Sequence, residues 1–347
     1  MFRRLTPDAS PTPAEGPSDR PRRWGLYGPY IALAIAVALW SGAWWSARQT
    51  VVRHMDELIS GYRAAGYDLS WTQRTVSGYP FRLDVVLTQF KGVSPSGWGL
   101  TSERLEGEAY MHAPDHWVFG APQGLSLLRP QGETIEVTGS TLHASLHGLD
   151  MRPPSLSVEG LNLRFKSASG IQPLALTTAD KVEFHIRPGP DRQGAVLFRL
   201  INGRSTPRGP LDLIAAGRPV DLQLEAIFSK ADALQGPGLA KSFRTWALAG
   251  GRATLKEAKV TAGDAMIKTS PGDLSLTPDG YLSGLLDVTL NKGNDALLAL
   301  SYLGVTPHSA GTALPPRSQI EGPRVLLFRN DATYLGSVQI GPGTKVF

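Results

Sequence analysis

Hydrophobic and polar positions divide the chain into an uninterrupted apolar segment near the N-terminus and a long region in which the two kinds alternate. Residues 28–47 (GPYIALAIAVALWSGAWWSA) contain no charged side chain. At about 1.5 Å per residue, a helix of this length covers the ~30 Å hydrocarbon layer of a bilayer. The pattern therefore predicts a transmembrane helix over residues 28–47.

The side chains expected to contact the membrane are apolar or aromatic, and tryptophans gather at the C-terminal end, where such rings favour the headgroup level. They are Tyr30, Ile31, Leu33, Ile35, Val37, Leu39, Trp40, Trp44 and Trp45. Two other interpretations are a signal peptide cleaved near Ser41-Gly42-Ala43 and a buried helix of a soluble domain. The length of the uncharged segment and the tryptophans beside that cleavage site favour an uncleaved anchor.

The residues before this segment predict its orientation. Residues 1–27 are rich in proline and arginine and are expected to form a disordered arm. Five arginines precede the span, whereas Arg48 and Arg53 just after it are offset by Asp56 and Glu57. Because positive residues stay on the cytoplasmic side, we expect a single-pass protein of a bacterial-type inner membrane, with the arm in the cytoplasm and the rest in the periplasm.

Residues 48–66 carry an apolar stripe at helical spacing, which predicts an amphipathic helix that ends at Gly66. The stripe consists of Val51, Val52, Met55, Leu58, Ile59 and Tyr62. This helix either continues the membrane span outwards or packs on the following domain. We favour packing, because an exposed stripe of this kind would promote aggregation.

From residue 67 onward the apolar residues recur at every second position, as in half-buried strands. Residues 67–71 and 81–87 resemble a hairpin around a turn at 77–80, and similar segments follow at 141–146, 155–165, 181–186, 195–201, 220–228 and 252–261. Two short helices are expected at 238–249 and 295–303, a surface loop at 307–317, and a closing hairpin from 324–328 and 334–340. The fold class is therefore mainly β: an antiparallel meander over residues 67–347 that forms a curved sheet or an open sandwich.

Composition and charge exclude some functions. The net charge is +5 in 347 residues, too small for a typical nucleic-acid binder, so we expect no nucleic-acid partner. The chain contains no cysteine, which excludes disulfides and thiolate chemistry.

Candidate chemistry is sparse. The sequence contains no nucleophile elbow, phosphate-binding loop or dinucleotide fingerprint. His143 and His147 lie in a predicted strand, where four residues span about 13 Å, too far to share a metal. His112 and His116 enclose Pro114, and Asp115 could supply only one carboxylate beside them. We therefore predict no catalytic, cofactor-binding or metal site, and no enzyme.

Three segments resemble a family of uncharacterised, mostly alphaproteobacterial membrane-anchored envelope proteins known as DUF2125. They are the N-terminal helix with Trp71 and the motif Gly78-Tyr79-Pro80-Phe81, the strands of residues 274–290, and the ending at 322–342. The resemblance implies an envelope location and structural roles for Trp71, Gly78, Tyr79, Pro80 and Phe81, with no catalytic residues. The succession of short strands joined by Asp-Gly turns is more loosely similar to AsmA-like proteins, whose apolar β-groove is associated with lipid movement.

Two functions remain open after these observations. The exported domain could bind or move a membrane lipid in an apolar groove, or it could be a structural or assembly partner of an envelope protein. A groove requires a concave face lined by apolar side chains, whereas a filled sandwich leaves no continuous cavity.

The predicted orientation can be tested with reporter fusions. We expect alkaline phosphatase fused after Ala65 to be active, because it folds only outside the cytoplasm and the arginines precede the span. The same fusion after residue 27 should be inactive and serves as the control. An inactive fusion after Ala65, or a mature N-terminus near Ala43, would contradict the prediction.

Overall fold

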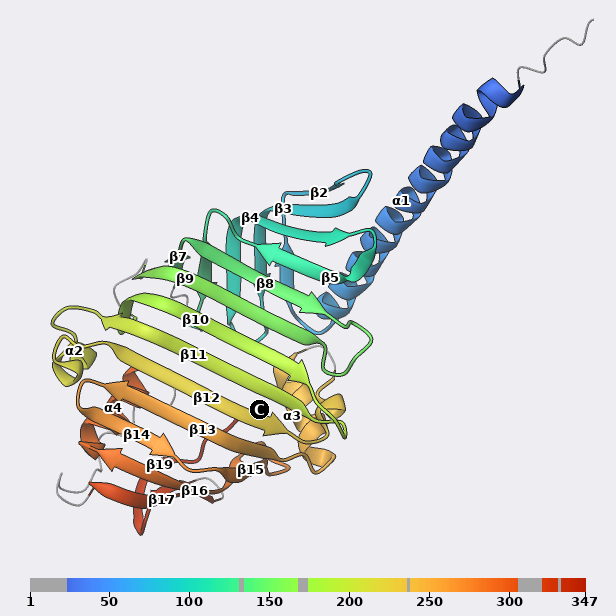
Figure 1. Cartoon of the computed structure of the whole chain (residues 1–347). Helices are drawn as coiled ribbons and strands as arrows, with labels where there is room; N and C mark the ends of the chain where they lie inside the picture. The colour runs from blue at the N-terminus through green and yellow to red at the C-terminus, as the bar shows by residue number, and fades with distance from the viewer. Residues whose placement is uncertain (1–23, 131–133, 168–173, 236–237, 305–319, 330–331) are drawn as a thin grey trace, which may run out of the picture.

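The computed structural model describes residues 24–130, 134–167, 174–235, 238–304, 320–329 and 332–347. One long helix, α1 (Trp24–Ala64), leads into a single curved antiparallel sheet (Figure 1). Within the described residues this sheet contains 19 strands. The predicted mainly β fold with an N-terminal apolar helix is confirmed, and its form is one curved sheet.

The strands follow one another along the chain with short connections. They are β1 (Asp68–Ser70), β2 (Gln73–Ser77), β3 (Arg82–Val93), β4 (Gly99–Tyr110), β5 (Ala113–Gly120), β6 (Leu125–Leu128), β7 (Thr134–Thr138), β8 (Thr141–His147), β9 (Ser155–Ser167), β10 (Leu176–Pro188), β11 (Gly194–Ser205), β12 (Val220–Phe228), β13 (Ala253–Ala262), β14 (Ala265–Thr269), β15 (Gly272–Leu276), β16 (Leu282–Asn291), β17 (Gly322–Arg329), β18 (Ala332–Leu335) and β19 (Val338–Pro342). The helices after α1 are α2 (Pro210–Ala215), α3 (Leu239–Leu248) and α4 (Gly293–Tyr302), with a 3₁₀ turn at Ala231–Ala233.

Long strands pair with two short ones in several places, which bends the sheet. β3 pairs with β2 over one half and with β1 over the other. β4 pairs with β5 and β6, and β9 pairs with β8 and β7, so that the two pairs of short strands lie side by side. From β9 to β13 the pairing is a regular meander.

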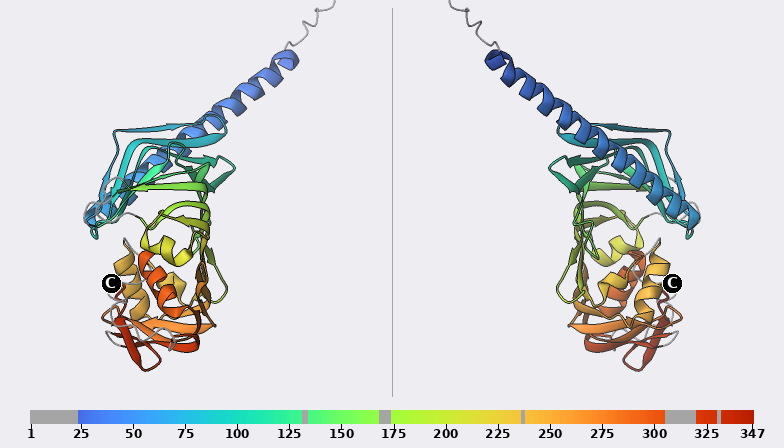
Figure 2. Two further views of the ribbon diagram at one scale, coloured as in Figure 1. Left: turned by 90° about the vertical axis from the view of Figure 1, so that its left-hand side faces the viewer. Right: turned by 90° about the vertical axis from the view of Figure 1, so that its right-hand side faces the viewer.

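The two faces of the sheet differ in chemistry. The concave face carries most of the buried apolar side chains, and α2, α3 and α4 lie inside the curve of its C-terminal part (Figure 2). The core beneath α2 and α4 is closely packed: Val220, Ala262 and Ala299 have no exposed surface. In the N-terminal part of the sheet, α1 lies inside the curve instead (Figure 2).

α3 covers the concave face through one tryptophan. Trp246 is 2% exposed and packs against Phe228 and Phe243, with ring centroids 5.6 and 6.2 Å away. Its indole N–H donates to the carbonyl of Ser229 at 2.7 Å, so the polar atom of this buried ring is satisfied.

Several element predictions were wrong in detail. Residues 28–64 lie in one continuous helix, which also includes residues 24–27 of the predicted arm and ends two residues before Gly66. The predicted strand at 67–71 corresponds to β1, which pairs with the C-terminal end of β3. The hairpin partner of the N-terminal half of β3 is β2. The closing hairpin is a three-stranded unit, β17 to β19, because Gly336 turns the chain between β18 and β19.

Other elements were missed. The strands between residues 99 and 138 were not predicted, nor was the six-residue helix α2. The helices predicted at 238–249 and 295–303 are confirmed as α3 and α4 with shifts of one or two residues. The surface loop at 307–317 lies outside the described residues, as do residues 1–23 of the arm.

Replacing Trp246 with alanine tests how far α3 contributes to the core. We expect Trp246→Ala to lower the free energy of unfolding by about 3–5 kcal/mol, because it leaves a large cavity under α3. Leu248→Ala, on the same helix with a side chain 71% exposed, should change it by no more than about 0.5 kcal/mol. Denaturant unfolding of the detergent-solubilised protein, followed by circular dichroism, measures both. Equal effects of the two variants would contradict a core role for α3.

Candidate functional site

An apolar cavity of about 830 Å³ lies between the C-terminal half of α1 and the concave face of the N-terminal strands. α1 contributes Ala43, Ser46, Ala47, Thr50, Val51, His54, Met55 and Leu58. The opposite wall consists of Leu83, Val85, Leu87, Leu105, Glu106, Gly107, Pro114, Trp117, Phe119, Leu146 and Leu149, from β3, β4, β5, β8 and the turn after β8. Here α1 stands away from the sheet and leaves space between them.

Polar contacts hold α1 against the sheet at both ends of this cavity. At one end the indole N–H groups of Trp40 and Trp44 donate to the carbonyls of Pro80 and Arg82, at 2.7 and 2.8 Å. At the other end the guanidinium of Arg63 donates to the carbonyl of Leu69 at 3.1 Å. Between them, Arg74 of β2 forms an ion pair with Asp56 at 2.6 Å. All of these partners lie between β1 and the start of β3, so α1 is held along one edge of the sheet.

The packing predicted for residues 48–66 is confirmed in part. Val51, Met55 and Leu58 of the predicted stripe face the cavity. Leu58 and Tyr62 remain 63% and 38% exposed, so the stripe is only partly covered. The alternative prediction was that this helix continues the apolar segment 28–47. This is also the case, because both segments belong to α1 without a break.

The motif residues Gly78, Tyr79, Pro80 and Phe81 form the β2–β3 turn, where they contact α1. Gly78 has φ +100°, and a Cβ there would lie 2.7 Å from the carbonyl oxygen of Arg82, so this turn requires glycine. The rings of Tyr79 and Trp44 meet edge to face at 5.5 Å, and Phe81 lies 6.3 Å from Trp40.

Trp71 lies at the other end of the cavity. The Arg63 guanidinium stands over its ring at 5.6 Å, which ties the end of α1 to the segment between β1 and β2.

The residues predicted to contact the membrane lie on α1, outside the sheet. Tyr30, Leu33 and Leu39 are each at least 62% exposed, and the most apolar 18-residue window of the helix has no buried residue. Ile31, Ile35, Val37, Trp40 and Trp45 are also exposed, whereas Trp44 is half-buried. The helix is long and apolar enough to cross a membrane. The sequence did not reveal that Trp40 and Trp44 also bind the β2–β3 turn.

The histidines considered for metal binding lie in or beside strands. His143 and His147 are on β8, as predicted, and the rings of His147 and His116 lie 5.4 Å apart. His116 and Pro114 belong to β5, which was not predicted to be a strand. Within the described residues, no three His, Cys, Asp or Glu side chains are grouped to hold a metal ion.

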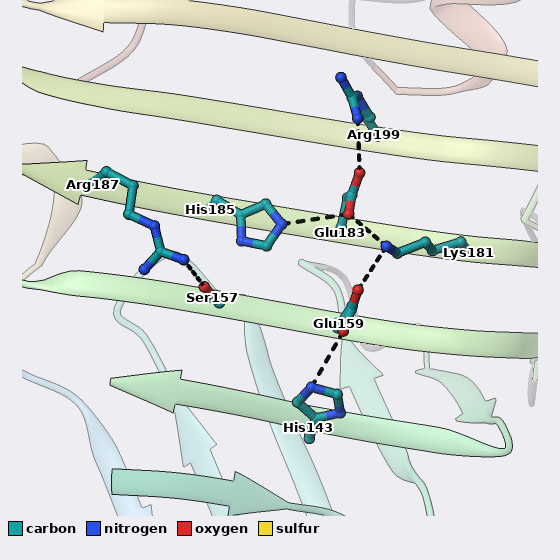
Figure 3. A network of polar contacts seen from close by, with 8 residues as sticks. All are labelled: His143, Ser157, Glu159, Lys181, Glu183, His185, Arg187 and Arg199. Atoms are coloured by element: carbon teal, nitrogen blue, oxygen red, sulfur yellow. Dashed lines mark hydrogen bonds and ion pairs between the residues drawn. The ribbon is translucent and has the colours of Figure 1, made fainter. Parts of the chain in front are cut away.

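A network of charged residues crosses strands β8 to β11 on the convex face (Figure 3). Lys181 bridges Glu159 and Glu183, at 2.6 and 2.8 Å. Arg199 and His185 each approach Glu183 at 3.4 Å, and His143 approaches Glu159 at the same distance. Arg187 lies beside them and donates to Ser157 at 3.0 Å.

This network is charge-balanced internally, which indicates a structural role. The ammonium of Lys181 lowers the pKa of both Glu183 and Glu159, and these carboxylates raise the pKa of Lys181. Glu183 is only 8% exposed, so its negative charge depends on these partners. We therefore regard the cavity as the stronger functional site.

Together these features define a class of protein in which one membrane-length helix continues as the cover of an apolar cavity in a curved sheet. A model of the family described as "Uncharacterized protein conserved in bacteria (DUF2125)" matches residues 44–342, and the chain belongs to this family. The match includes the part of α1 that covers the cavity. No curated protein and no solved structure matches the chain significantly.

Removing the ammonium of Lys181 tests the charged network. We expect Lys181→Met to lower the free energy of unfolding by about 1–3 kcal/mol at pH 7, because the nearly buried Glu183 loses its strongest partner. Lys91→Met is the matched control: its partner Asp68, at 2.7 Å, is 60% exposed, and the expected loss is about 0–1 kcal/mol.

The network also predicts a pH dependence. The pKa values of Glu159 and Glu183 are lowered by folding, so the stability they contribute is present above the unfolded-state pKa of about 4.3. That stability disappears as the pH falls through the lower folded-state values. Denaturant titrations between pH 3 and pH 7 should show a steeper acid loss for the unmodified chain than for Lys181→Met. Parallel curves would contradict this assignment.

Proposed function

We propose that this protein is a single-pass, membrane-anchored envelope protein that binds an acyl chain of a membrane lipid in the cavity beneath α1. In this proposal the N-terminal arm is cytoplasmic, the sheet domain is periplasmic, and no reaction is catalysed. The observation that carries the proposal is the cavity itself. Its volume lies within the ~300–1,000 Å³ that is usual for small-molecule sites, and its lining is almost wholly apolar.

The size of the cavity favours an occupant. A ligand in this space would supply the van der Waals contacts that its apolar lining lacks. Water is a poor filling, because side chains such as Leu83, Val85 and Trp117 offer it few hydrogen-bond partners. A flexible hydrocarbon chain matches both the chemistry and the volume.

The position of the cavity favours a ligand from the membrane. Its lining begins at Ala43, which belongs to the uncharged segment 28–47. An acyl chain could therefore pass along α1 from the bilayer into the cavity without crossing water. The more polar lining, Ser46, Thr50 and His54, lies along one side of α1 at intervals of four residues and could face the glycerol or headgroup region.

Filling the cavity with a larger side chain tests lipid binding. In Thr50→Trp, an indole projects from half-buried Thr50 into the space beneath α1 and should remove most of the lipid binding. Gln49→Trp adds the same group to an adjacent exposed position that does not line the cavity, and should bind as the unmodified chain does.

The measurement must distinguish cavity lipid from lipid that surrounds the anchor. We suggest full-length protein in vesicles of phosphatidylethanolamine and phosphatidylglycerol that contain a phospholipid with a photoreactive acyl chain. Cavity binding should cross-link peptides that contain residues 83–87 and 105–119, and Thr50→Trp should lose these cross-links. Cross-links confined to residues 28–47 in the unmodified chain would contradict lipid binding and favour a structural or assembly role.

A further inference from the structure

The β2–β3 turn extends along α1 in the direction of the uncharged segment, as three successive contacts show. Arg48, the first charged residue after that segment, donates to the carbonyl of Val76 near the end of β2. Trp44 then contacts Tyr79 and the carbonyl of Arg82, and Trp40 contacts Pro80 and Phe81. Arg48 and Trp40 are eight residues apart, about 12 Å along a helix axis. The tip of the turn therefore lies beside residues predicted to be inside the membrane interface.

The tip has the chemistry of a membrane-contacting segment. Residues 78–81 contain no charge, and the side chains of Tyr79 and Phe81 are 52% and 65% exposed. The neighbouring β4–β5 turn adds Tyr110, which is 49% exposed. The first charged side chain after the tip, Arg82, is paired with Glu108 at 3.1 Å and with Asp84 at 3.4 Å. Exposed aromatic rings flanked by paired charges are typical of the headgroup region.

Several carbonyl groups at the tip have hydrogen-bond donors inside the protein. Carbonyl groups that enter a bilayer must find hydrogen-bond donors inside the protein. Arg82 N–H donates to Gly78, Trp40 to Pro80, Met111 N–H to Phe81, and Trp44 to Arg82, all within 2.7–2.9 Å. Pro80 has no N–H, and the Tyr79 hydroxyl is paired with Ser41 Oγ at 2.9 Å. The carbonyls of Gly78, Pro80, Phe81 and Arg82 are thus paired within the protein.

We propose that the β2–β3 turn, residues 78–81, inserts into the interface of the membrane that α1 crosses and forms a second membrane contact beside the helix. This inference rests on the membrane anchor of the proposed function and adds a surface that is not part of that anchor. Two contacts from different elements restrict rotation of the sheet about α1. The end of the cavity near Ala43 is thereby kept next to the lipid.

Site-directed fluorescence tests the insertion, and the absence of native cysteine makes single labelling sites straightforward. Phe81→Cys places an environment-sensitive nitrobenzoxadiazole dye at the tip, and Tyr79→Cys is a second tip variant in case the first disturbs the turn. Ile35→Cys reports on the anchor, and Leu213→Cys, on α2 with a side chain 78% exposed, reports on water. All variants are studied as full-length protein in vesicles of phosphatidylethanolamine and phosphatidylglycerol, with circular dichroism to check folding.

The four labelled positions give distinguishable outcomes. We expect blue-shifted emission and quenching by nitroxide-labelled lipid at positions 81, 79 and 35, and neither effect at 213. Quenching at 35 without quenching at 79 or 81 overturns the inserted turn but leaves the anchor intact, and the aromatic tip is then a surface for a protein partner. Absence of quenching at 35 overturns the anchor, and the inserted turn with it.

Discussion

The concave face of the sheet must be covered, and the rest of the architecture depends on how the chain meets this constraint. A single antiparallel sheet with one apolar face is unstable in water unless another layer removes that face from solvent. The C-terminal strands are covered by α2, α3 and α4, which leave side chains such as Val220 and Ala299 without exposed surface. The N-terminal strands have only α1, which is held along one edge and stands away from the opposite wall.

The closely packed core and the cavity therefore lie in different parts of the sheet. The packed C-terminal cores supply buried area, whereas the N-terminal third retains an apolar space that its own side chains do not fill. Function commonly lies where packing is incomplete, because a ligand can provide the missing contacts there. The continuity of α1 matters for the same reason. One continuous helix passes from the uncharged segment to the cavity, so the positions of these two features are fixed relative to each other.

The sequence predicts those features that depend on local periodicity. The uncharged segment is readable from its length without a charge. The alternation in β3 and the regular meander from β9 to β13 are readable because their strands have one apolar and one more polar face. The strands from β4 to β7 were missed for a physical reason. Two buried positions of β4 are the small residues Gly107 and Ala109, which give a weak apolar signal, and short strands that share a long partner lack the length for a clear period. α2 has only six residues, fewer than two turns.

The sequence predicted that an apolar groove could exist, but not which residues would form it. Alternating strands in a chain with a membrane-length helix pointed to an apolar groove, and the apolar stripe of residues 48–66 predicted packing on the domain. No local pattern shows that this helix leaves a space between itself and the sheet. The decisive contacts join residues far apart in the chain: Trp40 and Trp44 bind the turn at Pro80 and Arg82. On sequence grounds these tryptophans belong to the bilayer interface, and the structure gives their indole N–H groups a partner in the sheet. One residue type thus satisfies two requirements, because an indole ring can face lipid while its N–H group binds a carbonyl. The same contacts fix α1 against the sheet beside the end of the cavity near Ala43.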